Sequence, residues 1–508
     1  MAATLTKLSS NTLMRAILGA ARSALDPTLR KGLEFVCVLC KFFVVETATI
    51  TVRDPVFWLR LATQGDLGFA EAFMYGEVDC LDLTALFEVL LDNRSCLSEI
   101  DTLLAKASRV VERFCATNLV NNLANARQNI SAHYDISNEM FMAFLSGDMT
   151  YSCAIFPELD TDLHESPLPT AASESSADPS AYSSTASPSS SEGTLSGVKI
   201  SQASTRISEA AVRRTRDKDD DAELCDAQIR KMLHIVKRAD IRPGHRVLEI
   251  GSGWGSMAIC MAQAFPGVTV DTLTLSEEQA HLARQRVAEI GLGPRPCQKV
   301  RVHLMDYRSM PKEWEGIFDR IVSVEMVEAV GQEFLETYWA RIDWALKRDT
   351  GVGVVQGITL PEARFEAYVR DTDFIRKWVF FPGGFLPTLS LLISTMTSGS
   401  KGRLIVDSVD NIGPHYARTL REWRRRFENR FDAEIVPALR KQYADVLSDG
   451  APGSQEEIEV FRRKWLYYFA YCEVGFASRS LGDHIVTFTR EGHVEYGCQV
   501  LGSDVDVE

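Results

Sequence analysis

The sequence predicts an α/β fold in which a mostly parallel sheet is wrapped by helices, with a smaller helical and β region (α+β) before it. Between residues 223 and 508, short apolar segments alternate with segments of helical periodicity. A glycine-rich turn follows the first of these apolar segments. With 508 residues, 45% of them apolar, the chain is long enough for two or three domains with ample cores.

Charge and cysteine usage exclude several classes of protein. The 55 basic residues against 69 acidic ones give a net charge of -14, which argues against nucleic acid as the main partner. The eleven scattered cysteines follow no secretory signal, so we expect reduced thiols and a cytoplasmic protein. Cys37 and Cys40 form a lone CxxC, and we predict no metal site. Residues 1–25 contain basic residues and no acid, which would also suit a mitochondrial targeting segment.

Composition divides the chain into four regions. Residues 1–125 form the N-terminal helical and β region, in which residues 43–52 are rich in β-branched side chains. Residues 126–160 connect it to a serine-rich segment, residues 161–222, with nine serines between positions 171 and 190. That segment cannot bury enough apolar surface to offset its chain entropy, so we predict a disordered insertion. Residues 223–508 form the α/β domain.

The elements of the α/β domain follow from periodicity. Apolar residues from Cys225 to Val236 recur at helical spacing, which predicts an amphipathic helix. The predicted strands are residues 246–250, 268–275, 301–306, 319–324 and 351–359, and a helix is predicted over 256–265. The alternation predicts parallel strands joined by helical crossovers.

The turn after the first strand is the sharpest local signal. Its residues include Glu249, Gly251, Gly253 and Gly255, and glycines let the backbone turn tightly and approach a ligand. A dinucleotide-binding turn would need an acid at the end of the second strand, where Thr274 stands instead. The pattern resembles motif I of S-adenosylmethionine (AdoMet) methyltransferases, with a nucleotide site or a purely structural turn as alternatives.

Further positions fit such a cofactor. In open α/β sheets the ligand lies beyond the carboxyl ends of the strands. Asp306 and Tyr307 end the third strand, where this fold commonly places a residue against adenine. Thr274, Leu275 and Gln279 lie where the second strand faces the ribose. The alternative for each is ordinary capping of a strand end.

Four separated strings carry a wider resemblance. They are HYDISN at 133–138, GDMTYSCAIF at 147–156, FIRKWVFFPGGFLP at 374–387 and NIGPHYARTLREW at 411–423. Together they resemble cyclopropane-fatty-acyl-phospholipid synthases and mycolic acid cyclopropane synthases, from about residue 65 to 495 without the insertion. The string VEMVEAVG at 324–331 looks closer to the eukaryotic members. The resemblance implies a seven-stranded AdoMet-methyltransferase sheet, with substrate and cofactor covered by residues 126–160 and a lipid-binding cover at about 360–440. It also implies that Tyr151 and Ser152 touch AdoMet.

The resemblance implies methylene transfer from AdoMet to the cis double bond of unsaturated phospholipid acyl chains. The reaction passes through a carbocation, so the site must exclude water and hold a base at the new methyl group. In the family that base is a bound bicarbonate, and its ligands here would be Cys153, Glu328, Tyr416 and the backbone of Ile358. Gln356 stands where bacterial members usually have histidine. An ionised acid would repel the anion, so we expect burial to raise the pKa of Glu328.

A lipid substrate implies peripheral contact with a phospholipid membrane. A helix after Pro414 carries six arginines, interleaved with Trp423 and Phe427, which suits an anionic membrane surface. The alternative is a solvated charged helix balanced by Glu422 and Glu428. A dimer contact and an approach to the membrane are both open roles for the N-terminal domain. Aromatic residues that could line an acyl tunnel are Tyr151, Phe156, Phe374, Phe380, Phe381 and Tyr468.

Three other functions remain open from the sequence. One is a C-methyltransferase acting on another unsaturated lipid, such as a sphingoid base, or giving a methyl-branched product. Another is N-methylation of a small amine, which has no need of a bicarbonate site. The third is a catalytically idle lipid-binding module.

Overall fold

The computed structural model describes residues 3–4, 48–92, 138–163, 222–293, 299–379, 384–448 and 450–497. Most of the predicted insertion and of the proposed targeting segment lies outside these residues. So do three residues named from the sequence, His133, Phe380 and Phe381.

A seven-stranded sheet forms the centre of the α/β domain, with the strand order β6-β5-β4-β7-β8-β10-β9. Its strands are β4 (Arg246–Ile250), β5 (Thr269–Thr274), β6 (Val300–Leu304), β7 (Arg320–Val324), β8 (Val352–Thr359), β9 (Leu404–Asn411) and β10 (Gly482–Arg490). The first five in chain order pair in parallel, whereas β10 runs antiparallel to both β8 and β9. The seven-stranded, mostly parallel sheet is therefore confirmed, and the five strands predicted by position lie within two residues of their expected bounds.

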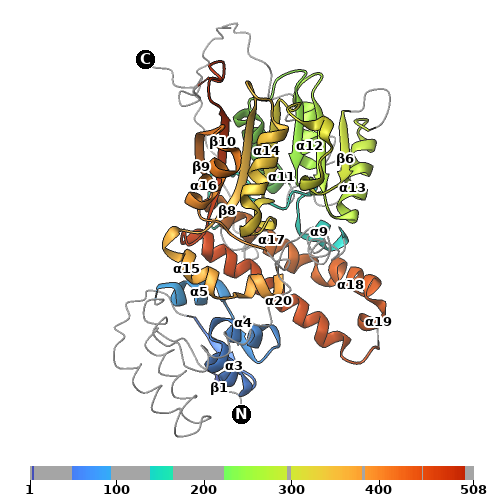
Figure 1. The fold of residues 1–508 in the computed structure, drawn as a ribbon. Coiled ribbons are helices and arrows are strands. Elements are labelled where there is room, and N and C mark those ends of the chain that lie inside the picture. Colours follow the sequence, from blue (N-terminus) through green and yellow to red (C-terminus); the bar gives the residue numbers. More distant parts are fainter. Residues whose placement is uncertain are drawn as a thin grey trace, which may run out of the picture.

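Helices cover both faces of this sheet (Figure 1). The helices are α11 (Ala222–Arg238), α12 (Ser256–Ala264), α13 (Glu277–Glu289), α14 (Leu335–Ala345), α15 (Glu362–Arg370) and α16 (Leu389–Ser400). Val247 belongs to the buried cluster that includes α11 and α12, and its neighbour Leu248 belongs to the cluster that includes α14. Successive side chains of a strand point to opposite faces, so β4 is buried on both.

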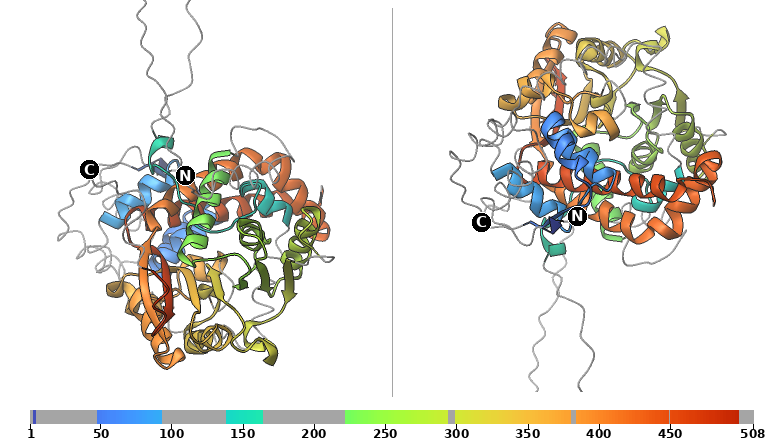
Figure 2. Two further views of the ribbon diagram at one scale, coloured as in Figure 1. Left: turned by 90° about the horizontal axis from the view of Figure 1, so that it is seen from above. Right: turned by 90° about the horizontal axis from the view of Figure 1, so that it is seen from below.

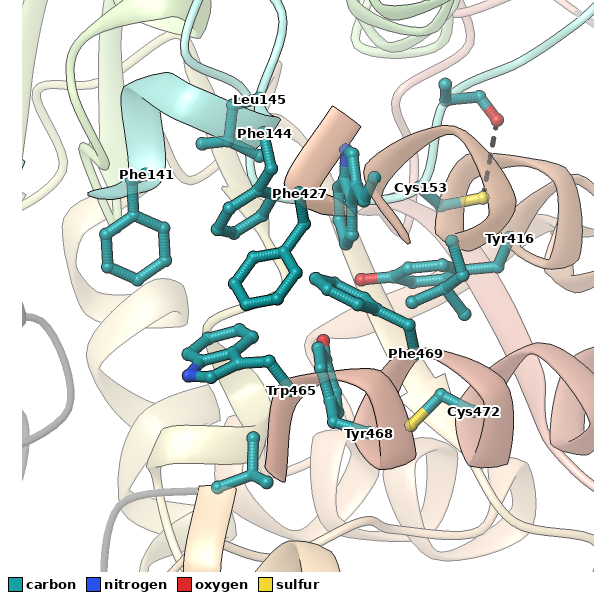
Figure 3. Packing of buried hydrophobic residues seen from close by; sticks show 14 of the residues in the cluster. Phe141, Phe144, Leu145, Cys153, Tyr416, Phe427, Trp465, Tyr468, Phe469 and Cys472 are labelled. Atoms are coloured by element: carbon teal, nitrogen blue, oxygen red, sulfur yellow. Dashed lines mark hydrogen bonds between the residues drawn. The ribbon is translucent and has the colours of Figure 1, made fainter. Parts of the chain in front are cut away.

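Two long helices cross the carboxyl end of the sheet. They are α17 (Gly413–Arg430) and α20 (Ser454–Ala477), and they pack against each other, while the short α9 (Asn138–Phe144) packs on α17. Figure 3 shows the aromatic core between them, in which Phe144, Phe427, Trp465 and Phe469 lie within contact distance. The connection from α17 to α20 includes α18 (Val436–Gln442) and α19 (Ala444–Leu447).

The N-terminal unit packs on α20, on the side away from the sheet (Figures 1 and 2). It contains β1 (Ala3–Thr4), β2 (Ile50–Val52), α3 (Val56–Gln64), α4 (Asp66–Met74), β3 (Val78–Cys80) and α5 (Leu83–Asp92), and its strands form a separate antiparallel sheet. Arg463 of α20 donates to the carbonyl of Val78 and forms an ion pair with Asp79. The unit is therefore fixed to α20, which also contributes Tyr468 to the cavity described below.

Three of the six arginines that the sequence assigned to a membrane-facing row on α17 pair instead with acids of the same protein. Arg418 is 1% exposed and pairs with Glu223, and Arg421 pairs with Asp162. Arg424 pairs with Glu473 of α20. A further correction concerns the interleaved aromatics, because Trp423 and Phe427 are completely buried. The basic and aromatic residues of α17 thus hold the helices together.

Among the described residues, no helix combines the length and the apolar character needed to cross a bilayer.

Candidate active site

The glycine turn after β4 adopts a conformation that favours glycine. Gly251, Gly253 and Gly255 all have positive φ angles, of 101°, 48° and 90°. A Cβ atom at Gly251 would lie 3.0 Å from the Cβ of Met326, and one at Gly255 would lie 3.2 Å from that of Ala283. The first two glycines line the cavity described next, whereas Gly255 caps α12 and packs against α13.

A cavity of about 190 Å³ opens at the carboxyl ends of the parallel strands. It brings together residues from the glycine turn, the ends of β5 and β7, and the cover helices. The sequence-predicted residues that line it are Tyr151, Ser152, Glu249, Gly251, Gly253, Thr274, Leu275, Gln279, Asp306, Tyr307, Glu328, Ile358 and Tyr416. Cys153, Gln356 and Gly255 do not line it.

The polar residues at the ends of β5 and β6 also serve local structure. Thr274 Oγ1 donates to Oε1 of Gln279 at 2.8 Å, and the backbone N–H of Ser276 donates to Thr274 Oγ1. Asp306 caps the turn after β6 and forms an ion pair with Arg308 at 2.7 Å. These side chains therefore do cap local structure, as the alternative interpretation held. All of these residues except Ser276 also line the cavity.

The described residues fit AdoMet in this half of the cavity. Because the glycines of the turn have no side chains, their backbone is accessible to a ligand in the cavity. The hydroxyl of Tyr307 is buried without a hydrogen-bond partner, so a polar ligand group could satisfy it. Burial raises the pKa of Glu249 to about 8, and a cationic ligand beside it would favour its ionised form.

Glu325 also lines the cavity, and its carboxylate accepts hydrogen bonds from three donors. Its Oε1 accepts from the backbone N–H of Cys153 at 2.8 Å and from Nε2 of Gln356 at 2.9 Å. Its Oε2 accepts from the hydroxyl of Tyr416 at 2.7 Å. Three donors to one carboxylate stabilise its charged form and oppose the effect of burial, which raises its pKa.

Two further carboxyl groups surround Glu325. Oε1 of Glu328 accepts from the backbone N–H of Ile358 at 2.5 Å, and its Oε2 is buried without a partner. Burial and the charge of Glu325 raise the pKa of Glu328 to about 8, which confirms the expected direction. Asp483 of β10 is fully buried and accepts from Gln356 at 2.8 Å, and burial raises its pKa well above the ordinary range. Burial therefore favours the protonated form of both groups.

Lys231 supplies a positive charge to this cluster. It lies on α11, is 1% exposed, and donates to Oγ of Ser152 at 2.5 Å. Burial lowers its pKa, whereas the attraction of Glu325 acts in the opposite direction. The cavity thus places one cation close to one stabilised carboxylate.

Cys153 contributes through its backbone rather than its side chain. Its thiol is buried and directed to the carbonyl oxygens of Ala154 and Ile412, at 3.3 and 3.5 Å, and Figure 3 shows one of these contacts. Burial also raises the pKa of this thiol well above its usual range. In this structure the thiol of Cys153 is directed away from the cavity, and its backbone N–H is the donor that reaches Glu325.

The described residues do not fit a bicarbonate ion at the predicted position. Of its expected donors, Tyr416 and Gln356 already donate to Glu325, and the backbone of Ile358 donates to Glu328. A second anion there would have to displace a carboxylate held by protein donors, at a large electrostatic cost in a buried site.

Sequence reasoning missed Glu325, Asp483 and Lys231. Glu325 stands within VEMVEAVG, three residues before the glutamate that was singled out, and nothing in the string distinguishes the two. Lys231 lies on the buried face of an otherwise amphipathic helix, and a lysine placed there among apolar residues was the one available signal.

A family profile described as mycolic acid cyclopropane synthetase matches residues 121–169 and 215–484. The chain is 34% identical over 444 residues to tuberculostearic acid methyltransferase UfaA1 of Mycobacterium tuberculosis, covering 87% of this chain and 82% of that protein. It is 26% identical over 455 residues to cyclopropane-fatty-acyl-phospholipid synthase of Escherichia coli, covering 89% and 90%.

Among solved structures, coclaurine N-methyltransferase superposes with a TM-score of 0.51 at 16% identity, covering 83% of this chain and 98% of that one. This likeness establishes the shared methyltransferase fold.

Proposed function

Since the chain belongs to the mycolic acid cyclopropane synthetase family of AdoMet-dependent methyltransferases, we propose that it transfers a methylene group from AdoMet to the cis double bond of unsaturated phospholipid acyl chains. The product of this proposed reaction is a cyclopropane fatty acid. Its similarity to the Escherichia coli cyclopropane-fatty-acyl-phospholipid synthase over nearly the whole of both chains supports this substrate class.

One observation carries the proposal. One cavity contains both the glycine turn and the partly buried carboxylate of Glu325, so that a cofactor bound at the turn has a proton acceptor in the same cavity. Aromatic side chains line the same cavity, among them Tyr468 and Tyr416. The ring of Tyr416 stacks on Phe476. A carbocation formed there would meet little water.

AdoMet, when bound, supplies an electrophilic methyl group on a sulfonium. The residues of this chain hold the two reactants and exclude water. Gly251 and Gly253 leave room for the cofactor, and Tyr307 offers it a free hydroxyl. The hydroxyls of Tyr151 and Tyr468 form a hydrogen bond of 3.0 Å with each other, and both residues line the cavity.

A methyl-branched product is the second candidate. The 34% identity to a protein named as a tuberculostearic acid methyltransferase favours it. Both routes share the attack of the double bond and the loss of a proton, but a saturated methyl branch also needs a reductant.

Expression in a bacterial host that lacks its own cyclopropane synthase separates these products. Mass spectrometry of the fatty acids should show a gain of one CH2 with loss of the double bond if a ring forms. A gain of CH4 would identify a saturated methyl branch. Cells with Gly251→Ala provide the control, and unchanged fatty acids in the presence of folded wild-type protein would contradict the proposal.

A further inference from the structure

We propose that Glu325 is the base that removes the proton in this reaction, in the place of a bound bicarbonate. This inference rests on the proposed function, because it names the group that completes the same reaction.

The first argument is geometric. Three of the residues that the resemblance places around the anion donate to the Glu325 carboxylate: Cys153 through its backbone N–H, Gln356 through its amide and Tyr416 through its hydroxyl. A carboxylate and a bicarbonate present similar pairs of oxygens to donors. The protein has therefore filled the anion position with its own side chain.

The second argument is the backbone at this residue. Glu325 has a φ of 46°, in the left-handed region that a residue with a side chain adopts only with strain. Its backbone N–H is held by the carbonyl of Gln356. Glycine would adopt this conformation without strain. What glutamate provides here, and glycine would not, is a carboxylate.

The third argument is access. Glu325 lines the cavity and is only partly buried, whereas Asp483 is fully buried and does not line it. Glu328 also lines the cavity, but one of its oxygens accepts from the backbone N–H of Ile358, and burial raises its pKa, which favours its protonated form. Among these three acids, Glu325 alone both lines the cavity and accepts hydrogen bonds from three donors, which oppose the rise in its pKa that burial causes. Further titratable groups that interact electrostatically with Glu325 are Lys231, Tyr416, Tyr468 and the thiol of Cys153.

The step balances without another reactant. The π electrons of the double bond form a new bond to the donor methyl carbon, and the bond from that carbon to sulfur breaks with its electron pair left on sulfur. The Glu325 carboxylate then takes a proton from the new methyl group, and the freed C–H electron pair closes the ring onto the cationic carbon. Glu325 ends protonated and returns its proton to water when the product leaves.

The test compares wild type with Glu325→Gly and Glu325→Gln, using AdoMet and vesicles of unsaturated phospholipid in carbonate-free buffer. Wild type should form product at a rate that added bicarbonate does not change. Glu325→Gly relieves the backbone and vacates the anion position, so it should lose at least a hundredfold in rate and regain part of it with bicarbonate or formate. Glu325→Gln should stay inactive with either anion, because the amide still fills the position.

A second readout is independent of turnover. Carbon-13 NMR with labelled bicarbonate should show a bound signal for Glu325→Gly and none for wild type, and titration should show unchanged AdoMet affinity in all three proteins. A wild-type rate that depends on bicarbonate, or a Glu325→Gln variant with the wild-type rate, would overturn the inference while leaving the proposed function intact. Wild type that forms no lipid product under either condition would overturn both.

Discussion

The hydroxyl of Tyr416 donates a 2.7 Å hydrogen bond to Oε2 of Glu325, which joins the cover helix α17 to the carboxyl end of β7. The ring of Tyr416 stacks on Phe476 with centroids 4.4 Å apart, so its position does not depend on that hydrogen bond alone. The donor can therefore be removed with little change in packing.

Tyr416→Phe should reduce the rate of lipid modification roughly tenfold to a hundredfold, since a hydrogen bond to a charged group contributes about 1.5–3 kcal/mol. The lost donor also stabilised the ionised form of Glu325, so the pKa of that group should rise and the rate should increase with pH later than in wild type. Steady-state rates across pH test this. Tyr467→Phe, at a buried residue outside the cavity, is the control. An unchanged pH profile for Tyr416→Phe would contradict the assignment.

Gly251→Ala should weaken AdoMet binding at least tenfold. The new Cβ would lie 3.0 Å from Met326 on a backbone with a φ of 101°, which strains the turn and narrows the cavity. Calorimetric titration with AdoMet measures the affinity. Gly244→Ala is the matched control, because Gly244 also has a positive φ, of 80°, but does not line the cavity. Equal affinity losses in both variants would show that strain alone is responsible.

Glu328 should make the free energy of unfolding depend on pH. Its pKa is raised from 4.5 to about 8 in the folded protein, so between these values the folded state holds a proton that the unfolded state has released. This contribution to stability is complete below about pH 4.5 and is lost as the pH rises towards 8. Thermal unfolding at several pH values should show a flatter dependence for Glu328→Gln than for wild type. Parallel curves would indicate that Glu328 is ionised in the folded state.

Arg418→Gln should lower the melting temperature without changing vesicle binding. The buried guanidinium lies over the ring of Phe156 and pairs with Glu223, whose side chain is 56% exposed, and losing a hydrogen bond to a charged group costs about 1.5–3 kcal/mol. Arg348→Gln is the control, since Arg348 is 79% exposed and its ion pair is a surface one. Vesicle sedimentation beside a thermal scan measures both properties. Reduced vesicle binding with unchanged stability would restore the membrane-facing role of α17.

The sheet was predictable where apolar runs and helices alternate, because each crossover unit carries its own local signal. The antiparallel strands β9 and β10 had no such signal. Asp483 and Thr487 are buried polar residues within β10, so the strand does not read as an apolar run. Its pairing with β8, which lies more than a hundred residues earlier, depends on tertiary contacts.

The candidate site divides in the same way. Gly251 and Gly253 were predictable because glycines in a turn after a strand indicate backbone conformations with positive φ. Glu325 was not, because its role depends on a left-handed backbone conformation and on donors from α17 and β8, which only the folded chain brings together. The internal pairing of the α17 arginines was equally hidden, since their partners are distant in sequence.

The most direct test incubates purified protein with AdoMet carrying a fully deuterated methyl group and vesicles of unsaturated phospholipid, followed by mass spectrometry of the acyl chains. Ring formation should leave two of the three deuterium atoms in the product, because the base removes one from the transferred carbon. Acyl chains without deuterium, together with unconsumed AdoMet, would contradict transfer of a one-carbon unit to the double bond.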